Sequence, residues 1–262
     1  MADPIVTLTT DFGAASPYVA AMKGVILGIN PAARIVDLSH QVPPQDIRYV
    51  DWFLAATIPC FPGGVIHIVV VDPGVGTERA LLYVEVDGQR LLLPDNGCWT
   101  TLARAAAPNV RRLTETRFWR QPISATFHGR DILAPVAAHL SLGAPPASLG
   151  PIVSEWTTLD LPPARTGANC VMGEVMFVDP FGNLISNIPG AMVPSPPDLL
   201  RVGKKSFRRK FRWVRTYAEA EPGQLVALVS SCGNVELAVV EGSAAQRVKA
   251  SVGTDVTIGW AR

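Results

Sequence analysis

The chain has 262 residues, 48% of them hydrophobic, which suffices for one large domain or two smaller ones with substantial cores and argues against global disorder. The formal net charge of +1 argues against a whole-protein electrostatic grip on nucleic acid or on a membrane surface. With 23 Pro and 22 Gly, we expect short elements separated by many turns.

Targeting and redox signals are absent from the sequence as given. The first residues, MADPIVTLTTDFG, lack the basic start and apolar run of a signal peptide, and no uncharged apolar stretch approaches the roughly 18 residues of a membrane helix. No two of the four cysteines form a C-x-x-C pair, so free thiols are expected rather than a zinc site: Cys60, Cys98, Cys170 and Cys232. We therefore expect a cytoplasmic protein that holds no metal and crosses no membrane.

The first half of the chain alternates strand and helix signals. The predicted strands are residues 5–9, 35–38, 65–71, 81–86 and 90–93. The predicted helices are residues 18–29, 46–57 and 131–142. The run VIHIVVV at 65–71 is almost continuously apolar, as expected of a strand buried on both faces. This alternation predicts an α/β layered domain with a mainly parallel sheet.

A proline-rich stretch at 143–163 separates this half from a region of different character. The following strand-like runs are short and separated by Gly: 173–178, 225–229, 235–240 and 255–258. They predict a smaller antiparallel β-barrel. We expect an N-terminal α/β domain at 1–155, a linker at 156–166 and a C-terminal β-barrel domain at 167–262.

The segment GKKSFRRKFRWVR at 203–215 carries seven basic residues and no acidic one. Three interleaved aromatics make a nucleic-acid patch one interpretation. A solvated hairpin or an interface edge is the alternative, and we prefer it, so nucleic acid is not an expected partner.

Three acidic residues each follow a predicted strand and lie close to a Gly: Asp11, Asp72 and Asp95. Each also suits a turn on its own. Ligands of open α/β sheets bind at the carboxyl ends of the strands, so the three would converge if their strands are neighbours. Among four histidines, only His128, in TFHGRD just before a predicted helix, is a candidate for chemistry.

An ordered set of motifs connects these residues. TTDFG, VVDPGVGTER, PDNG, TFHGRD, DPFGN and SSCGNVELAVVEGSAA occur in that order between residues 5 and 260. The set resembles the S-adenosylmethionine hydrolases, or hydroxide adenosyltransferases, which are related to fluorinase and chlorinase. The resemblance implies an α/β domain followed by a β-barrel, assembled as a homotrimer with active sites between subunits.

The implied reaction is hydrolysis of S-adenosylmethionine to adenosine and methionine by attack of water or hydroxide at the ribose C5′, with no cofactor. The implied catalytic set is Asp72, Arg79 and His128. Gly129 replaces a halide-contacting Ser of fluorinase-type enzymes, and Gln45 replaces a Trp, which favours hydroxide over halide.

The resemblance also implies substrate-binding residues. Asp11 would bind the ribose, Asp179 the methionine amino group, and Ser231 and Glu236 the amino-acid portion. Asn183 and the backbone of 239–241 would meet the adenine, with Val239 at the start of that stretch and Val240 where the family usually carries Asn.

Two alternatives stay open on the sequence. One is a halide adenosyltransferase of the chlorinase type on the same substrate. The other is a nucleoside- or RNA-binding module that uses the basic stretch and has no catalytic activity.

Overall fold

The computed structural model describes residues 4–260, which fall into two compact units that divide between Leu159 and Asp160. Each unit has its own hydrophobic core. No helix within residues 4–260 is long and apolar enough to cross a membrane.

The first unit is built on a six-stranded sheet with the order β2-β1-β3-β5-β4-β6. The strands are β1 (Ile5–Thr10), β2 (Arg34–Ser39), β3 (Ile66–Val70), β4 (Leu81–Val86), β5 (Gln89–Pro94) and β6 (Asn109–Arg112). Strands β2, β1, β3 and β5 run parallel, whereas β4 is antiparallel to both of its neighbours. The prediction of a mainly parallel sheet is confirmed.

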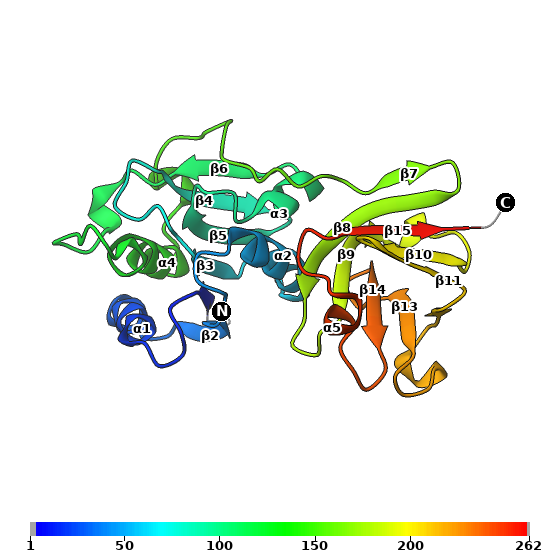
Figure 1. The fold of residues 1–262 in the computed structure, drawn as a ribbon. Coiled ribbons are helices and arrows are strands. Elements are labelled where there is room, and N and C mark those ends of the chain that lie inside the picture. The colour runs from blue at the N-terminus through cyan, green and yellow to red at the C-terminus, as the bar shows by residue number, and fades with distance from the viewer. Residues whose placement is uncertain (1–3, 261–262) are drawn as a thin grey trace. The chain divides into compact units, whose positions relative to one another are not determined.

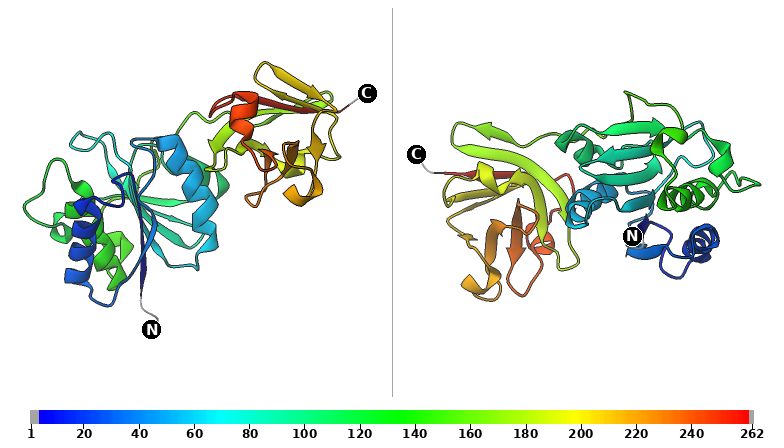
Figure 2. Two further views of the ribbon diagram at one scale, coloured as in Figure 1. Left: turned by 60° about the horizontal axis from the view of Figure 1, so that its bottom comes forward. Right: turned by 180° about the vertical axis from the view of Figure 1, so that it is seen from behind.

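Helices cover both faces of this sheet (Figures 1 and 2). They are α1 (Pro17–Ile29), α2 (Ile47–Thr57), α3 (Thr100–Ala105) and α4 (Ala134–Ser141). Along β3, Ile66, Ile68 and Val70 pack with α1 and α4, while Val69, and Val71 just after the strand, pack with α2 and α3. Alternate side chains of a strand point to opposite faces, so an uninterrupted apolar run is what this central position requires.

The helix predicted at 131–142 is wrong at its start. Residues Gly129–Leu133 form a π-helical turn, η3, and α4 begins only at Ala134. Periodicity cannot distinguish this wider turn from an α-helix, because both bury one continuous face. The turn follows directly on His128 and therefore sets where that side chain leaves the backbone.

Short 3₁₀ turns connect many of the elements. They are η1 (Ile58–Cys60), η2 (Thr116–Phe118), η4 (Pro146–Ser148), η5 (Gly190–Met192) and η6 (Tyr217–Glu219). Each ends within a single turn, as expected for this hydrogen-bond geometry.

The second unit is a curled, almost entirely antiparallel sheet with one short helix (Figure 1). Its strands are β7 (Arg165–Gly167), β8 (Cys170–Val178), β9 (Leu184–Pro189), β10 (Leu199–Val202), β11 (Lys205–Arg208), β12 (Arg212–Trp213), β13 (Leu225–Val229), β14 (Asn234–Val239) and β15 (Asp255–Gly259), and its helix is α5 (Ala244–Val248). The order is β11-β10-β15-β8-β9-β14-β13-β12, with β7 paired to β8, and the β12–β13 pair is parallel. The predicted class, α/β followed by a smaller antiparallel β-domain, is confirmed.

The basic stretch forms β11, β12 and the loop between them. Its aromatic residues Phe207, Phe211 and Trp213 pack against the core of the second unit. Lys205 Nζ donates to the backbone oxygen of Arg247 at 2.9 Å. Aromatic rings that serve the core are not free to stack on bases, which favours the solvated hairpin over the nucleic-acid patch.

We expect Ile68→Ala to destabilise the first unit by about 2–5 kcal/mol, because it empties space in the middle of a fully buried strand. Urea denaturation followed by circular dichroism measures this. The matched control is Leu142→Ala, whose side chain is 59% exposed and should change the free energy of unfolding by less than about 0.5 kcal/mol. Equal losses in the two variants would contradict this account of the core.

Candidate active site

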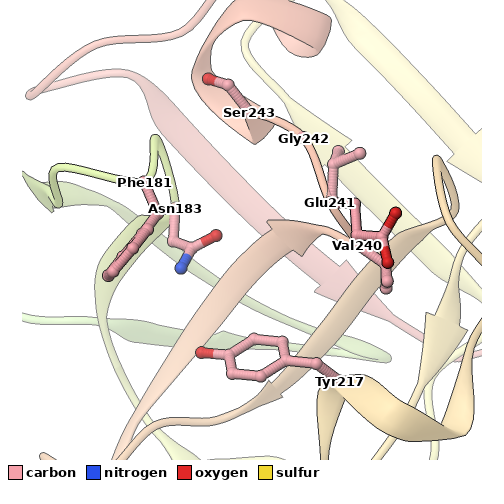
Figure 3. Close-up of a pocket in the computed structure, with 8 residues that line it drawn as sticks. Phe181, Asn183, Tyr217, Val240, Glu241, Gly242 and Ser243 are labelled. Atoms are coloured by element: carbon pink, nitrogen blue, oxygen red, sulfur yellow. The ribbon is translucent and has the colours of Figure 1, made fainter.

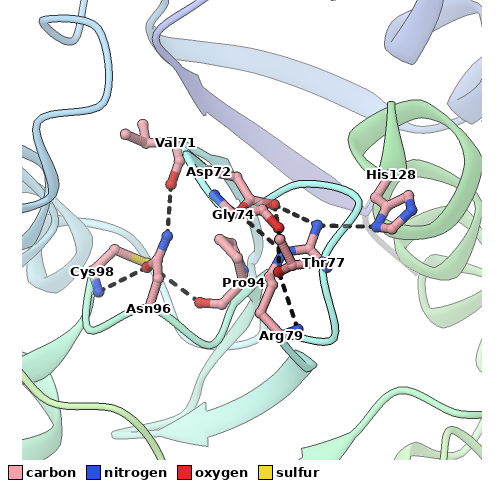
Figure 4. A network of polar contacts seen from close by, with 9 residues as sticks. All are labelled: Val71, Asp72, Gly74, Thr77, Arg79, Pro94, Asn96, Cys98 and His128. Carbon is pink, nitrogen blue, oxygen red and sulfur yellow. Dashed lines mark hydrogen bonds and ion pairs between the residues drawn. The ribbon is translucent and has the colours of Figure 1, made fainter. Parts of the chain in front are cut away.

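The loop from β3 to β4 folds back on itself and brings Arg79 onto Asp72 (Figure 4). The backbone N–H of Gly74 donates to Asp72 Oδ1 at 3.2 Å. Thr77 Oγ1 donates to the Gly74 carbonyl at 2.7 Å and accepts from the Arg79 N–H at 3.3 Å. Arg79 Nε then donates to Asp72 Oδ2 at 2.8 Å. The segment DPGVGTER thus forms a loop of the length that lets its last residue, Arg79, pair with its first, Asp72.

The same guanidinium reaches His128. Arg79 Nη2 lies 3.0 Å from His128 Nδ1 and also bonds Asp72 Oδ2. An arginine N–H can only donate, so Nδ1 is the acceptor and the proton of the neutral ring lies on Nε2. Burial, then the Arg79 charge, lower the pKa of His128, against opposing contributions from Asp72 and Asp131. The neutral ring is therefore favoured near neutral pH.

Close packing fixes the backbone just after His128. A Cβ at Gly129 would lie 3.1 Å from both methyl groups of Val70 and 3.4 Å from the sulfur of Met22. Because residue 129 has no side chain, the chain approaches β3 closely there, which brings His128 to the carboxyl end of the sheet.

Two cavities of the first unit meet at His128. The smaller, of about 120 Å³, is lined by Asp11, Asp72 and His128, together with Phe12, Gln45, Val70, Val75, Thr126, Phe127 and Gly129. The larger, of about 430 Å³, is lined by Arg79 and His128, together with Thr77, Ala80, Leu81, Arg112, Leu113, Thr114, Trp119, Ile123 and Ile132. The predicted catalytic set therefore lies at the partition between the two.

Of the three strand-end acids, the structure brings two together. Asp11 follows β1 and Asp72 follows the neighbouring β3, and both line the smaller cavity. Asp11 Oδ2 accepts from the backbone N–H of Gln45 at 2.9 Å. Asp95 lines neither cavity, and its Oδ1 instead accepts from the N–H of Thr157 at 2.7 Å.

The DPFGN motif of the second unit is a turn organised by Asp179. Its Oδ1 accepts from the N–H groups of Phe181 and Asn183 at 2.9 and 2.8 Å. Gly182 has φ +82°, and an added Cβ would collide with Ser243, so only Gly fits. The turn leaves the Phe181 ring 77% exposed and turns Asn183 inward.

These residues border a cavity of about 580 Å³, which is lined by Phe181, Asn183, Tyr217, Val239, Val240, Glu241, Gly242 and Ser243 (Figure 3). Asn183 Nδ2 donates to Asp179 Oδ2 at 2.9 Å, which leaves the amide oxygen for a ligand. Glu241 has φ +52°, and this turn presents the backbone of 240–241 to the cavity. The cavity is largely apolar with a few polar groups, a combination suited to a planar heterocycle.

The residues predicted to bind the amino-acid portion do not line this cavity. Glu236 is buried and accepts from the Tyr217 hydroxyl at 2.5 Å. Burial, and then the nearby Asp179, raise the pKa of Glu236, opposed by the Tyr217 bond. Ser231 is exposed in the turn between β13 and β14. Neither these two nor Asp179 is among the described residues that line the cavity.

Sequence reasoning missed Tyr217, Phe12 and Phe181. Phe12 and Phe181 lie inside the motifs TTDFG and DPFGN, so attention to the apolar member of each motif would have found them. Tyr217 begins a short turn with a capping box between Thr216 and Glu219, a pattern that signals a helix start and not a site. Within residues 4–260, no three His, Cys, Asp or Glu side chains are grouped so as to hold a metal ion.

Comparison with known proteins places this chain in a family. Its sequence matches the SAM hydroxide adenosyltransferase N-terminal domain over residues 6–150 and the C-terminal domain of that family over 173–257. An (R)-S-adenosyl-L-methionine hydrolase of Salinispora tropica is 42% identical over 92% of both chains. A fluorinase of an Actinoplanes species is 24% identical over 98% of this chain and 97% of its own.

Among solved structures, that of an uncharacterized conserved protein from Thermotoga maritima matches with a TM-score of 0.92. It is 34% identical, over 97% of this chain and 99% of that one. Together with both family domains in their order, this shows that the chain belongs to the SAM hydroxide adenosyltransferase family.

Proposed function

We propose that this protein hydrolyses S-adenosylmethionine to adenosine and methionine, with Asp72, Arg79 and His128 activating the attacking water. The observation that carries the proposal is the hydrogen-bonded contact of these three side chains beside a cavity that also presents Asp11. Relatives that are 38–42% identical and bear the name (R)-S-adenosyl-L-methionine hydrolase support the same substrate and reaction.

Each unit, taken by itself, carries groups whose chemistry suits one part of the substrate. In the second unit we place the adenine in the cavity that Phe181 and Tyr217 line, with the Asn183 amide oxygen as an acceptor for a base N–H (Figure 3). The Asp11 carboxylate, held by the Gln45 N–H, accepts from ribose hydroxyls. Our candidates for binding the amino-acid portion remain Asp179, Ser231 and Glu236. The Glu236 carboxylate would then accept hydrogen bonds from the substrate as well as from the Tyr217 hydroxyl.

The reaction balances without an added cofactor. A water oxygen forms a bond to C5′, the C5′–S bond breaks, and its electron pair neutralises the sulfonium to give the thioether of methionine. One proton is released. The sulfonium is already a good leaving group, so the chemical difficulty lies in supplying and orienting the oxygen.

The ion pair limits what charge alone can do. One isolated guanidinium about 4 Å from a hydroxide would stabilise it by roughly 4 kcal/mol at an effective dielectric of 20. Asp72 is bonded to the same guanidinium and offsets most of that field. The set therefore acts mainly through directed hydrogen bonds and a proton acceptor placed at the cavity.

The tautomer of His128 assigns the proton. With Nδ1 occupied by Arg79, Nε2–H is a donor that orients the water oxygen, and Nε2 has no lone pair to accept a proton. Asp72, which lines the smaller cavity, is the remaining acceptor. We assign Asp72 as the group that takes the proton while the oxygen attacks, and His128 as the group that positions the oxygen.

The absence of a side chain at Gly129 bears on halide use. The position offers no hydroxyl to a halide, and a Cβ there would press on Val70. Hydroxide transfer is therefore favoured over the chlorinase-type alternative. The family resemblance further implies a homotrimer, which mass photometry would detect as three times the mass of one chain.

Purified protein should convert S-adenosylmethionine to adenosine without added cofactor, including in high chloride. Arg79→Ala and His128→Ala should lower kcat by about 10²–10⁴-fold, with little change in substrate binding measured by calorimetry, because both groups act on the water. Liquid chromatography identifies the products. Arg111→Ala and His139→Ala are the matched controls. Formation of 5′-chloro-5′-deoxyadenosine, or full turnover in the first two variants, would contradict the proposal.

We expect kcat/KM to fall with decreasing pH only below the ordinary histidine pKa near 6.5, because the active ring is neutral and its pKa is lowered. Arg79→Gln should raise the pKa of His128, since it removes a positive charge that disfavours protonation. Initial rates over a range of pH measure the first effect. NMR titration measures the pKa of His128 in the unmodified protein and in Arg79→Gln. The pKa of His139, which burial alone lowers, should not change in that variant. A His128 pKa above 6.5 in the unmodified protein would refute the assignment.

Phe181→Ala should raise KM by about tenfold while kcat changes less, because stacking a base on an aromatic ring is worth roughly 1–3 kcal/mol. Initial-rate kinetics measure the effect. Ile152→Ala, which truncates another exposed apolar side chain, is the control. An unchanged KM in Phe181→Ala would contradict the proposal that the adenine binds in this cavity.

A further inference from the structure

Asp131 is a fully buried carboxylate three residues after His128. Burying a charge is costly unless it is paired and hydrogen-bonded, and Asp131 is both. Arg130 donates from Nε to Oδ1 and from Nη2 to Oδ2, each at 2.7 Å. Arg120 Nη1 donates to Oδ1 at 3.1 Å, and the Ser124 N–H donates to Oδ2 at 2.9 Å. No partner is a residue of the proposed catalytic set.

These bonds close the loop that leads to His128. The Asp131 backbone adds two more, because its carbonyl accepts from the Arg120 N–H at 2.8 Å and its N–H donates to the Phe127 carbonyl at 3.1 Å. Residues 120–127 are thereby fastened at both ends and in the middle to one residue of η3. This loop supplies Ile123 to the larger cavity, and Thr126 and Phe127 to the smaller one.

The backbone on either side of His128 is therefore held from two directions. On one side Gly129 lies tightly against Val70 of β3. On the other the loop is tied to Asp131. Among residues 4–260, the His128 side chain has one hydrogen-bond partner, Arg79, and this bond alone would not define the position of the ring.

We propose that Asp131 is a positioning residue for the reaction: by fastening the loop 120–127 to η3, it holds His128 Nδ1 against the Arg79 guanidinium and thus orients Nε2–H toward the water. This inference rests on the proposed function for its effect on turnover. Its effect on the geometry of His128 is independent of that function and can be measured in the free protein.

The sign of one measurement separates positioning from charge. The charged groups that act on His128 are Arg79, Asp72 and Asp131, and the negative charge of Asp131 favours the protonated ring. Removing that charge alone would lower the pKa of His128 further. Releasing the ring from Arg79 and from its buried position would instead raise the pKa toward 6.5.

The test is Asp131→Asn, which keeps the shape of the side chain and removes its charge. NMR titration should show the pKa of His128 raised toward 6.5. Steady-state kinetics should show kcat lowered by about 10²-fold, the cost of a displacement near 1 Å, with KM changed by less than about threefold. An unchanged or lowered pKa of His128 would overturn the proposal even if turnover fell.

Asp51→Asn is the matched control. Asp51 is also a buried carboxylate of the first unit, 2% exposed, and accepts from the N–H and Oγ1 of Thr101 at 2.8 and 2.6 Å. It should lose stability in thermal denaturation but leave kcat and the pKa of His128 unchanged. The same changes in this variant as in Asp131→Asn would reduce the role of Asp131 to general stability, and so refute it.

If Asp131→Asn does not fold, Arg120→Ala takes its place. The Arg120 side chain is 44% exposed and supplies one bond to Asp131, so the chain should tolerate its loss. In this variant we expect the pKa of His128 to rise and kcat to fall, each by less than in Asp131→Asn. Inactive unmodified protein would reject the proposed function, whereas the His128 titration would still decide whether Asp131 positions the ring.

Discussion

A single guanidinium holds the candidate active site together. Arg79 bonds a carboxylate on one side and an imidazole on the other, and these two partners come from loops 56 residues apart in the sequence, at Asp72 and His128. Because Arg79 donates to both, it holds the Asp72 carboxylate in place and fixes the tautomer of the neutral ring, whose proton lies on the far nitrogen. The roles that we propose, Asp72 as proton acceptor and His128 as orienting donor, follow from the contacts of this one side chain.

The fold supplies the geometry that this interaction needs. Neighbouring parallel strands β1 and β3 end at one edge of the sheet, so Asp11 and Asp72 lie side by side without any long-range adjustment. The third partner arrives from a loop that is not part of the sheet, and its position depends on close packing at Gly129 and on the buried carboxylate of Asp131. The sheet therefore positions the two carboxylates directly, whereas the loop that carries His128 needs contacts of its own to hold its position.

The order of motifs and the apolar run of β3 were sufficient to predict the class of fold. The family resemblance carried by the motifs also named Asp72, Arg79 and His128 as a proposed catalytic set, and the structure brings these three side chains into hydrogen-bonded contact. The contacts themselves could not be predicted. The sequence does not show that Arg79 lies between its partners, because the loop that brings it back depends on hydrogen bonds of Thr77 and Gly74. Nor does it show that Asp95, in the same strand-end setting as Asp72, is taken up by a backbone N–H. Tyr217 was missed for a similar reason, since its role depends on which segment faces it across the cavity.

The tight approach of Gly129 to β3 also constrains how this family can diverge. A side chain at 129 requires Val70 to yield by a few tenths of an ångström or to be replaced by a smaller residue. The two positions are therefore epistatic: shortening residue 70 first leaves a small void that the protein tolerates, whereas enlarging residue 129 first strains the backbone that carries the histidine. Lineages that acquired a side chain at this point are expected to have changed the strand before the loop.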